Sequence, residues 1–187
     1  MPDAPDELIR LGYQARRGGH LAEARSVFSE SVGLSRAARD ERLLASALVG
    51  LGQIERDLKN TAAALQHYRE AVEIYRKGTH PVRLAHTIRH LADILRGDSN
   101  LELARPLYEE AVSIYRNNPG TTPLDLANAI RGFALLRGNA GESEEAKALW
   151  QEARALYESV DVQAGVQESE AQINRLSIDP FPQRAIE

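Results

Sequence analysis

The sequence predicts an all-α protein in which four helix pairs and a C-terminal capping helix form a right-handed α-α superhelix, or solenoid. The chain holds 27 Ala and 23 Leu against only 10 aromatic residues, which favours helices over strands. Similar segments recur every 40 to 42 residues, a period typical of helical repeat arrays. Turns rich in Gly, Asn and Ser separate stretches whose apolar residues have helical spacing.

The repeat is carried by an alanine that lies four residues before an aromatic ring. It occurs in four segments, of which 67–78, 107–118 and 149–160 are the most alike and 27–38 is the weakest. An apolar residue followed by a small one lies thirteen residues before each alanine, as in Leu11-Gly12. We expect the small residues to let helices approach closely beside the ring. The four pairs are Ala24/Phe28, Ala64/Tyr68, Ala104/Tyr108 and Ala146/Trp150.

Each repeat is expected to consist of a first and a second helix. The predicted repeats cover about 4–40, 41–80, 81–122 and 123–160, within a single domain of residues 1–187. The second helices are expected to begin after capping residues that suit a helix N-terminus. These caps are Asn60 or Thr61, Ser99 or Asn100, and Ser143.

After the fourth repeat, an apolar face predicts a capping helix over 161–177. A solenoid needs such a helix because its last repeat otherwise exposes apolar surface. Residues 178–187 are expected to form a frayed tail. Cap and tail together favour a complete chain over a slice of a larger protein. The apolar face consists of Val162, Val166, Ile173 and Leu176.

This pattern resembles the tetratricopeptide repeat family over about residues 6–160. The leading Trp of that family is replaced by Leu8, Leu48, Ile88 and Ile130, and the period exceeds the usual 34 residues. The longer period is similar to that of kinesin light chains and bacterial regulators. The resemblance implies that the first helices line a concave groove and that the rings of the second helices pack between repeats. Those rings are Phe28, Tyr68, Tyr75, Tyr108, Tyr115, Trp150 and Tyr157.

Composition argues against several classes of function. The absence of cysteine excludes a disulfide framework, a thiolate zinc site and a cysteine nucleophile. The first residues lack the basic and apolar regions of a signal peptide, and the longest near-apolar run, 43–54, is too short to span a membrane. A net charge of −4 argues against general nucleic-acid binding. We expect a cytoplasmic protein with no membrane or nucleic-acid partner.

The chain contains no recognisable catalytic motif. A phosphate-binding glycine loop, a Gly-x-Ser-x-Gly elbow and a His-Glu-x-x-His helix are all missing from the sequence. His86, His90 and Asp93 share one helical face at a spacing that suits a divalent metal. Because Arg89 lies between the histidines and repels a cation, we prefer a groove-lining role for this face. We therefore expect neither enzymatic activity nor a metal or other cofactor.

The predicted groove carries arginines at equivalent positions of successive repeats. Arg16, Arg56 and Arg96 are 40 residues apart, and Arg89 and Arg131 are 42 apart. The four first-helix windows 4–17, 44–57, 84–97 and 126–139 carry a charge of +3, whereas the remaining residues carry −7. The candidate peptide-binding residues are Tyr13, Arg16, Gln53, Arg56, His86, Arg89, His90, Asp93, Arg96, Asn128 and Arg131.

Two interpretations of these arginines remain open. In the structural one, a cation at a helix C-terminus complements the helix dipole, and Asp93 pairs with Arg89. In the functional one, the groove binds the carboxylates of an extended acidic peptide, since arginine binds carboxylates bidentately.

The sequence thus favours a non-catalytic protein–protein interaction scaffold that binds a peptide or partner segment, with an acidic segment as the preferred ligand. One alternative is a homo-oligomeric assembly module. Another is a sensor in which His86, Arg89, His90 and Arg131 hold a small anionic ligand.

Overall fold

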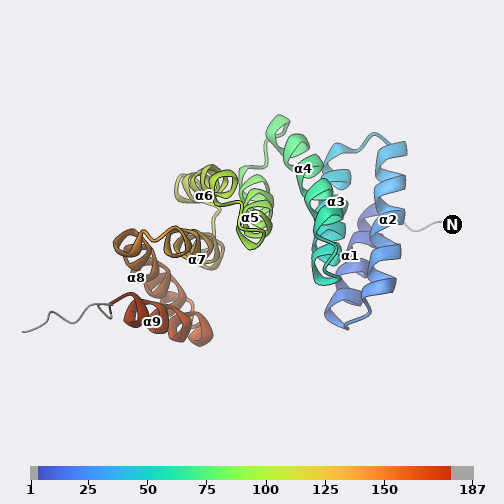
Figure 1. Ribbon diagram of the computed structural model, residues 1–187. Helices are drawn as coiled ribbons and strands as arrows, with labels where there is room; N and C mark the ends of the chain where they lie inside the picture. Colours follow the sequence, from blue (N-terminus) through green and yellow to red (C-terminus); the bar gives the residue numbers. More distant parts are fainter. Residues whose placement is uncertain (1–3, 178–187) are drawn as a thin grey trace, which may run out of the picture. The chain divides into compact units, whose positions relative to one another are not determined.

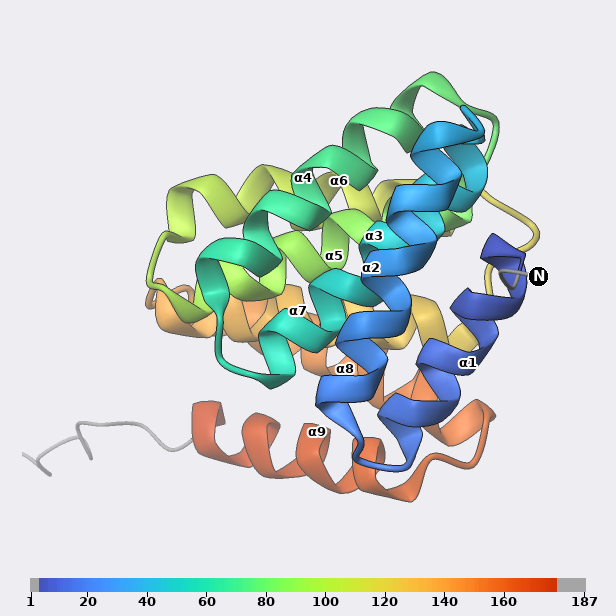
Figure 2. The same ribbon diagram turned by 90° about the vertical axis from the view of Figure 1, so that its right-hand side faces the viewer.

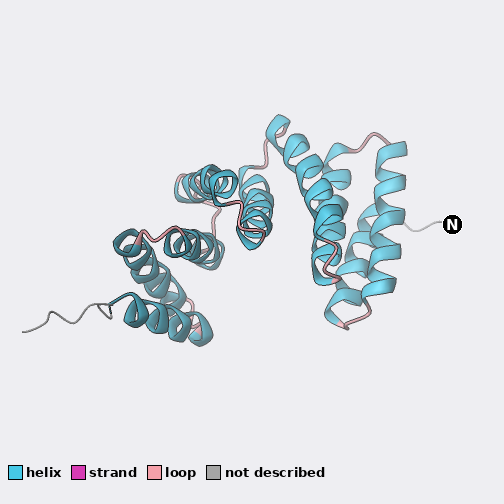
Figure 3. Cartoon of the chain, in the orientation of Figure 1, coloured by secondary structure: helices cyan, strands magenta, loops and turns pink. Residues whose placement is uncertain are grey.

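The computed structural model describes residues 4–177, and in this part of the chain it contains nine α-helices and no strand. The predicted all-α class is confirmed, and Figure 3 shows helices joined by short loops. The predicted tail, 178–187, lies outside the described residues. The helices are α1 (Pro5–Arg17), α2 (Leu21–Ala37), α3 (Glu41–Asp57), α4 (Thr61–Lys77), α5 (Pro81–Gly97), α6 (Leu101–Arg116), α7 (Pro123–Asn139), α8 (Ser143–Ser159) and α9 (Gln163–Ser177).

The chain divides into two compact units, of which the first ends at Ile94 and the second begins at Leu95. In unit 1, α1 packs against α2, α2 against α3, and α3 against α4 (Figure 1). In unit 2, α6 packs against α7, α7 against α8, and α8 against α9. The odd-numbered helices α1, α3, α5 and α7 are the predicted first helices, and α2, α4, α6 and α8 are the second.

The repeated rings form the core, as the sequence predicts. Phe28, Tyr68 and Tyr108 are fully buried, and Trp150 is 1% exposed. A Cβ atom added to Gly12 would lie 2.8 Å from the Phe28 ring, and one added to Gly52 would lie 3.0 Å from Cζ of Tyr68. The small residues therefore provide space for the rings.

Six of the turns between helices share one backbone motif. The amide of the residue before the next helix donates to a carbonyl five residues earlier, as in Asn60 to Glu55 at 2.7 Å and Asn100 to Leu95 at 2.8 Å. This is the Schellman arrangement, which requires a left-handed residue just after the helix. Glycine fills that position twice, and the other four residues are Arg39, Lys59, Ser99 and Asp161.

The predicted caps are only partly correct. Asn60 and Asn100 do occupy the N-cap positions, but neither side chain makes a capping hydrogen bond. The prediction of Ser143 is wrong, because Glu142 is the N-cap and Ser143 is the first helical residue. Side-chain caps occur instead at the first helices α3 and α7, where Asp40 accepts from the Leu43 amide and Thr122 from the Asp125 amide.

The last helix, α9, packs on α8 and differs in detail from the predicted cap (Figure 2). Gly165 and Ser169 are its buried residues, and a Cβ added to Gly165 would lie 2.4 Å from the Tyr157 ring. Val166 and Ile173 are only half-buried. The two helices thus approach through small residues, because a larger side chain would collide with the ring.

Candidate functional site

A cluster of polar side chains links the first helices of unit 1. Arg16, in the last turn of α1, reaches α3, where its Nε donates to Asp57 at 2.7 Å and its Nη1 donates to Gln53 at 3.0 Å. Arg56, in the last turn of α3, approaches α5, where its Nη1 lies 3.1 Å from Nδ1 of His90. Three successive first helices are thereby connected through their arginines.

His90 of α5 lies at the centre of this cluster. Its Nδ1 faces Arg56, whereas its Nε2 lies 2.9 Å from Nη2 of Arg89 and 3.1 Å from Nε2 of His86. A guanidinium only donates hydrogen bonds, and a neutral imidazole accepts at one nitrogen alone. Arg56 and Arg89 therefore compete for a single acceptor.

The surroundings of His90 favour its neutral form. Burial lowers the pKa of His90 well below its usual value near 6.5, and the positive charges of Arg89, His86 and Arg56 lower it further. Because an imidazolium here would face two guanidinium groups, His90 is neutral at pH 7.

Tyr68 of α4 lies against His90. The two rings stack with their centroids 5.5 Å apart and an interplanar angle of 16°. Tyr68 is fully buried, and its hydroxyl makes no hydrogen bond. Burial raises the pKa of Tyr68, so the hydroxyl keeps its proton and stays a donor.

Two aspartates balance part of the positive charge. Asp93 accepts from Nη1 of Arg89 at 2.8 Å, and Asp57 lies 3.4 Å from Nη2 of Arg56. Among these five side chains, the three positive charges of Arg16, Arg56 and Arg89 exceed the two negative charges of Asp57 and Asp93. We call this set the Arg–His cluster; it consists of Arg16, Gln53, Arg56, Asp57, Tyr68, His86, Arg89, His90 and Asp93.

The sequence identified most of this cluster but not all of it. The sequence did not predict Asp57 or Tyr68 as members of the cluster. Asp57 directly follows Arg56 and does not belong to the repeated pattern of arginines, and Tyr68 is predicted only to pack between repeats. One signal pointed to Tyr68, since it follows Arg56 by the same twelve residues that separate Tyr108 from Arg96. The ring of Tyr13, which is also predicted to line the groove, makes an edge contact with Phe28 with centroids 5.0 Å apart, and its groove role stays a prediction.

The remaining predicted residues lie in unit 2, each beside a partner of its own. Nε of Arg96 lies 3.3 Å from the Tyr108 hydroxyl, and Asn128 accepts a hydrogen bond from Tyr157 at 2.9 Å. Arg131 pairs with Glu168 of α9 at 2.6 Å. A binding role for these residues stays a prediction.

A second polar group lies on the first helices of unit 1. Oγ of Ser46 lies 3.2 Å from the Tyr75 hydroxyl and accepts from Nη1 of Arg83 at 3.1 Å. Ser46 precedes Arg56 by ten residues on α3, which corresponds to about 15 Å along the helix. We call the surface that carries both groups the first-helix face of unit 1.

Within residues 4–177, no group of three or more His, Cys, Asp or Glu side chains is arranged to hold a metal ion. Beside the paired histidines, Arg89 lies 2.9 Å from Nε2 of His90, where it would repel a cation. Over the same residues, no helix has the length and apolarity needed to cross a membrane.

These features define a class of protein, the helical repeat arrays built from stacked helix pairs. The tetratricopeptide repeat model matches residues 8–77 and 83–159. The chain therefore belongs to the tetratricopeptide repeat family.

Several solved structures share this fold. BtubC (BKLC) from P. vanneervenii has a TM-score of 0.75 at 19% identity, over 100% of this chain and 72% of its own. The nearly identical TPR-like repeats of a candidate kinesin light chain from Podosopora anserina have a TM-score of 0.68 at 15% identity. The match covers 94% of this chain and 97% of that one. Aspartyl phosphate phosphatase F from Bacillus subtilis has a TM-score of 0.74 at 16% identity. The match covers 90% of this chain and 44% of that one.

At such identities the likeness concerns the fold alone. No match was found among curated protein sequences.

Proposed function

We propose that this protein is a non-catalytic interaction scaffold, acting in the cytoplasm, whose first-helix face binds an extended or helical segment of a partner protein. The observation that carries the proposal is the gathering of Arg16, Arg56 and Arg89 from three successive first helices. A preformed rigid face of this kind binds a segment at little ordering cost to itself.

The charge of the face favours an acidic partner segment. The three arginines outnumber the two aspartates beside them, so a net positive charge remains. Arginine binds carboxylates through two parallel hydrogen bonds, which gives direction as well as attraction.

The spacing of the two polar groups suits an extended segment. The distance of about 15 Å between Ser46 and Arg56 corresponds to four or five extended residues at roughly 3.3 Å each. One such segment would contact the exposed Arg83, which lies beside the buried Ser46, at one end and the Arg–His cluster at the other.

The test compares two triple variants that change the charge equally. In the face variant, Arg16, Arg56 and Arg89 are replaced by glutamine. The control replaces Arg36, Arg116 and Arg154, which are 43–56% exposed and pair with glutamates between α2 and α4, α6 and α8, and α8 and α9. Both variants lose three positive charges and three sets of ion pairs.

Each protein is immobilised at physiological salt, and the captured proteins are quantified by mass spectrometry. We expect the control to keep the partners of the wild type and the face variant to lose them. Equal capture by both variants would contradict the proposal. Capture of the chain itself as the main partner would instead support the assembly alternative.

A further inference from the structure

The last helix, α9, leaves partly uncovered two apolar positions that the preceding repeat buries. Ile173 and Leu176 lie forty residues after Phe133 and Leu136 of α7. Phe133 is 8% exposed and Leu136 is fully buried in α7, which packs against α6 and α8. Ile173 and Leu176 are only half-buried, and within residues 4–177 no helix follows α9. In the described part of the chain, α9 is therefore a first helix without its second helix.

The same end of unit 2 carries an excess of negative charge. Nε of Arg154 on α8 lies 3.0 Å from Glu170 of α9, and its Nη2 lies 3.9 Å from Glu158. Glu170 is 50% exposed and Glu158 is 63% exposed. One guanidinium balances only one carboxylate, so a negative charge remains accessible here.

The repeat indicates which charge is missing at this end. Arg36 and Arg116 occupy equivalent positions eighty residues apart, and Glu158 follows Arg116 by the 42 residues of the last repeat step. Each of the two arginines pairs with a glutamate of the next second helix, Glu70 or Glu152. Because Glu158 inverts the sign of this position, a segment that takes the place of the next second helix should present a cation.

Residues 178–187, which follow α9 directly, contain the side chains that this end lacks. Phe181 is their only aromatic residue, and Arg184 is their only lysine or arginine. The prolines on either side of Phe181 disfavour a helix and favour the polyproline II conformation. That conformation has three residues per turn, so Phe181 and Arg184 would lie on one side of the segment, about 9 Å apart.

We propose that residues 178–184 fold back along α9 and take the place of the missing second helix. The Asp179-Pro180 pair favours the turn that reverses the chain. The ring of Phe181 packs on Ile173 and Leu176, and the guanidinium of Arg184 binds the glutamates beside Arg154.

The distances agree with this placement. About 9 Å along the segment corresponds to about six residues of α9, at 1.5 Å each. Counted back from Ile173 and Leu176, six residues end between positions 167 and 170. Glu170 lies there, beside Arg154 of α8.

The charges favour this segment over a second copy of the chain as the occupant. A second α9 would bring the same unbalanced glutamates to the face, whereas Arg184 neutralises one of them. Residues 178–184 are then held on α9 rather than frayed, and they occupy the place where a further helix would stack. The site belongs to unit 2 and does not rest on the proposed function.

NMR on the whole chain tests the contact directly. We expect nuclear Overhauser contacts between the Phe181 ring and the δ1 methyl group of Ile173. We also expect the resonance of this methyl group to move in Phe181→Ala, because the ring current is lost. If these contacts are absent and the resonance stays unchanged in Phe181→Ala, the inference is overturned.

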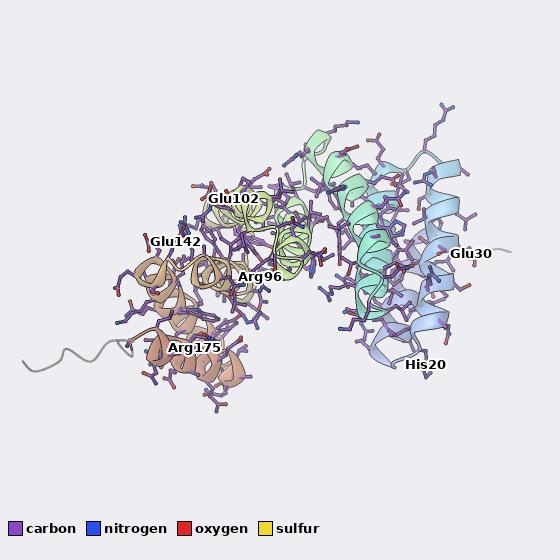
Figure 4. The ribbon with its side chains drawn as sticks, in the orientation of Figure 1. His20, Glu30, Arg96, Glu102, Glu142 and Arg175 are labelled. Atoms are coloured by element: carbon purple, nitrogen blue, oxygen red, sulfur yellow. The ribbon has the colours of Figure 1, made fainter. Side chains whose placement is uncertain are left out.

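Matched variants separate the docking from nonspecific effects of substitution. Phe181→Ala is expected to lower the thermal unfolding midpoint by about 3–6 °C, and Gln183→Ala, on another side of the segment, is expected to leave it unchanged. Arg184→Gln is expected to lower it by about 1–2 °C. Arg175→Gln is the control, because Arg175 is exposed on α9 (Figure 4) and makes no ion pair within residues 4–177. Equal midpoints for Phe181→Ala and Gln183→Ala would contradict the proposed contact.

A mixture of labelled and unlabelled chains distinguishes the two occupants. If the Phe181–Ile173 contacts persist within labelled chains after dilution with unlabelled ones, the segment docks on its own chain. If the Ile173 resonance instead depends on protein concentration and not on Phe181, a second copy covers the face and the inference is overturned.

Discussion

Replacing Gly50 by alanine forces a methyl group into space that the Phe28 ring already fills. The added Cβ would lie 2.2, 2.5 and 2.6 Å from three ring atoms, well inside the contact distance of about 3.5–4.0 Å between carbons. The ring is fully buried, and its other edge touches the site of a Gly12 Cβ at 2.8 Å. Phe28 therefore has little room to turn aside.

The expected cost follows from two opposing terms. Overpacking of this kind costs up to about 3 kcal/mol, and the better helix propensity of alanine recovers about 1 kcal/mol. We expect Gly50→Ala to lower the free energy of unfolding by about 2 kcal/mol. Gly33 is a matched control, because it is exposed within α2 and nothing lies within 4 Å of its added Cβ. Gly33→Ala should raise the free energy of unfolding by about 1 kcal/mol.

Urea unfolding followed by far-ultraviolet circular dichroism measures both variants. The prediction is a gap of about 3 kcal/mol between them at an unchanged m-value. The double variant Gly50→Ala/Phe28→Leu should recover part of the loss because the smaller side chain leaves room for the methyl group. If Gly50→Ala is stabilised as much as Gly33→Ala, the reasoning on ring packing is refuted.

Three further predictions concern turns and pH. Lys59→Gly relieves a left-handed residue with a φ of 64° and should raise the free energy of unfolding by about 0.5–1 kcal/mol, whereas Lys147→Gly, inside α8, should lower it by a similar amount. Arg105 and, after it, Arg137 lower the pKa of Glu142, at the start of α8 (Figure 4), from 4.5 to about 2. The stability that this carboxylate contributes is therefore present above pH 4.5 and lost as the pH falls towards 2. In thermal scans, the unfolding midpoint of Glu142→Gln should change less between pH 4.5 and 2 than that of the wild type. The pKa of His90 is also depressed, so the stability that its neutral form contributes is present above about pH 6.5 and shrinks at lower pH. In the same thermal scans, the unfolding midpoint of His90→Gln should fall less steeply with decreasing pH than that of the wild type. An equally steep fall would contradict the claim that His90 is neutral in the folded protein.

The repeat architecture was predictable because each alanine and ring that recur in the sequence occupy buried positions in the structure. Ala24, Ala64, Ala104 and Ala146 are all fully buried. Contacts that cross from one repeat to the next were harder to find. Gly50 receives Phe28 from the repeat before it, and that pairing depends on how the helices stack rather than on spacing within a repeat.

The left-handed conformation of residues other than glycine was not predicted from the sequence, although several of these turns were located. Arg39, Lys59 and Asp161 follow their helices with φ between 55° and 64°, although nothing in their side chains marks them as helix ends. The Schellman hydrogen bonds around them hold this conformation in place.

The candidate site was predictable as a set of equivalent arginines but not as a network. Spacing places Arg16 and Arg56 on the same face of successive first helices. It does not reveal that Asp57 of α3 pairs with Arg16 of α1, or that Arg56 of α3 lies 3.1 Å from His90 of α5. Those contacts depend on the register between repeats, which a single sequence leaves open.

The central claim is that a partner binds on the first-helix face of unit 1, and photo-crosslinking tests it most directly. A benzophenone amino acid is placed at position 13, where it replaces the aromatic side chain of Tyr13 on α1. In a matched protein it replaces Glu30, which is exposed on α2 (Figure 4). After irradiation, we expect a covalent partner adduct from position 13 and none from position 30. An adduct from position 30 alone, or from neither position while the partner is still captured, would contradict the claim.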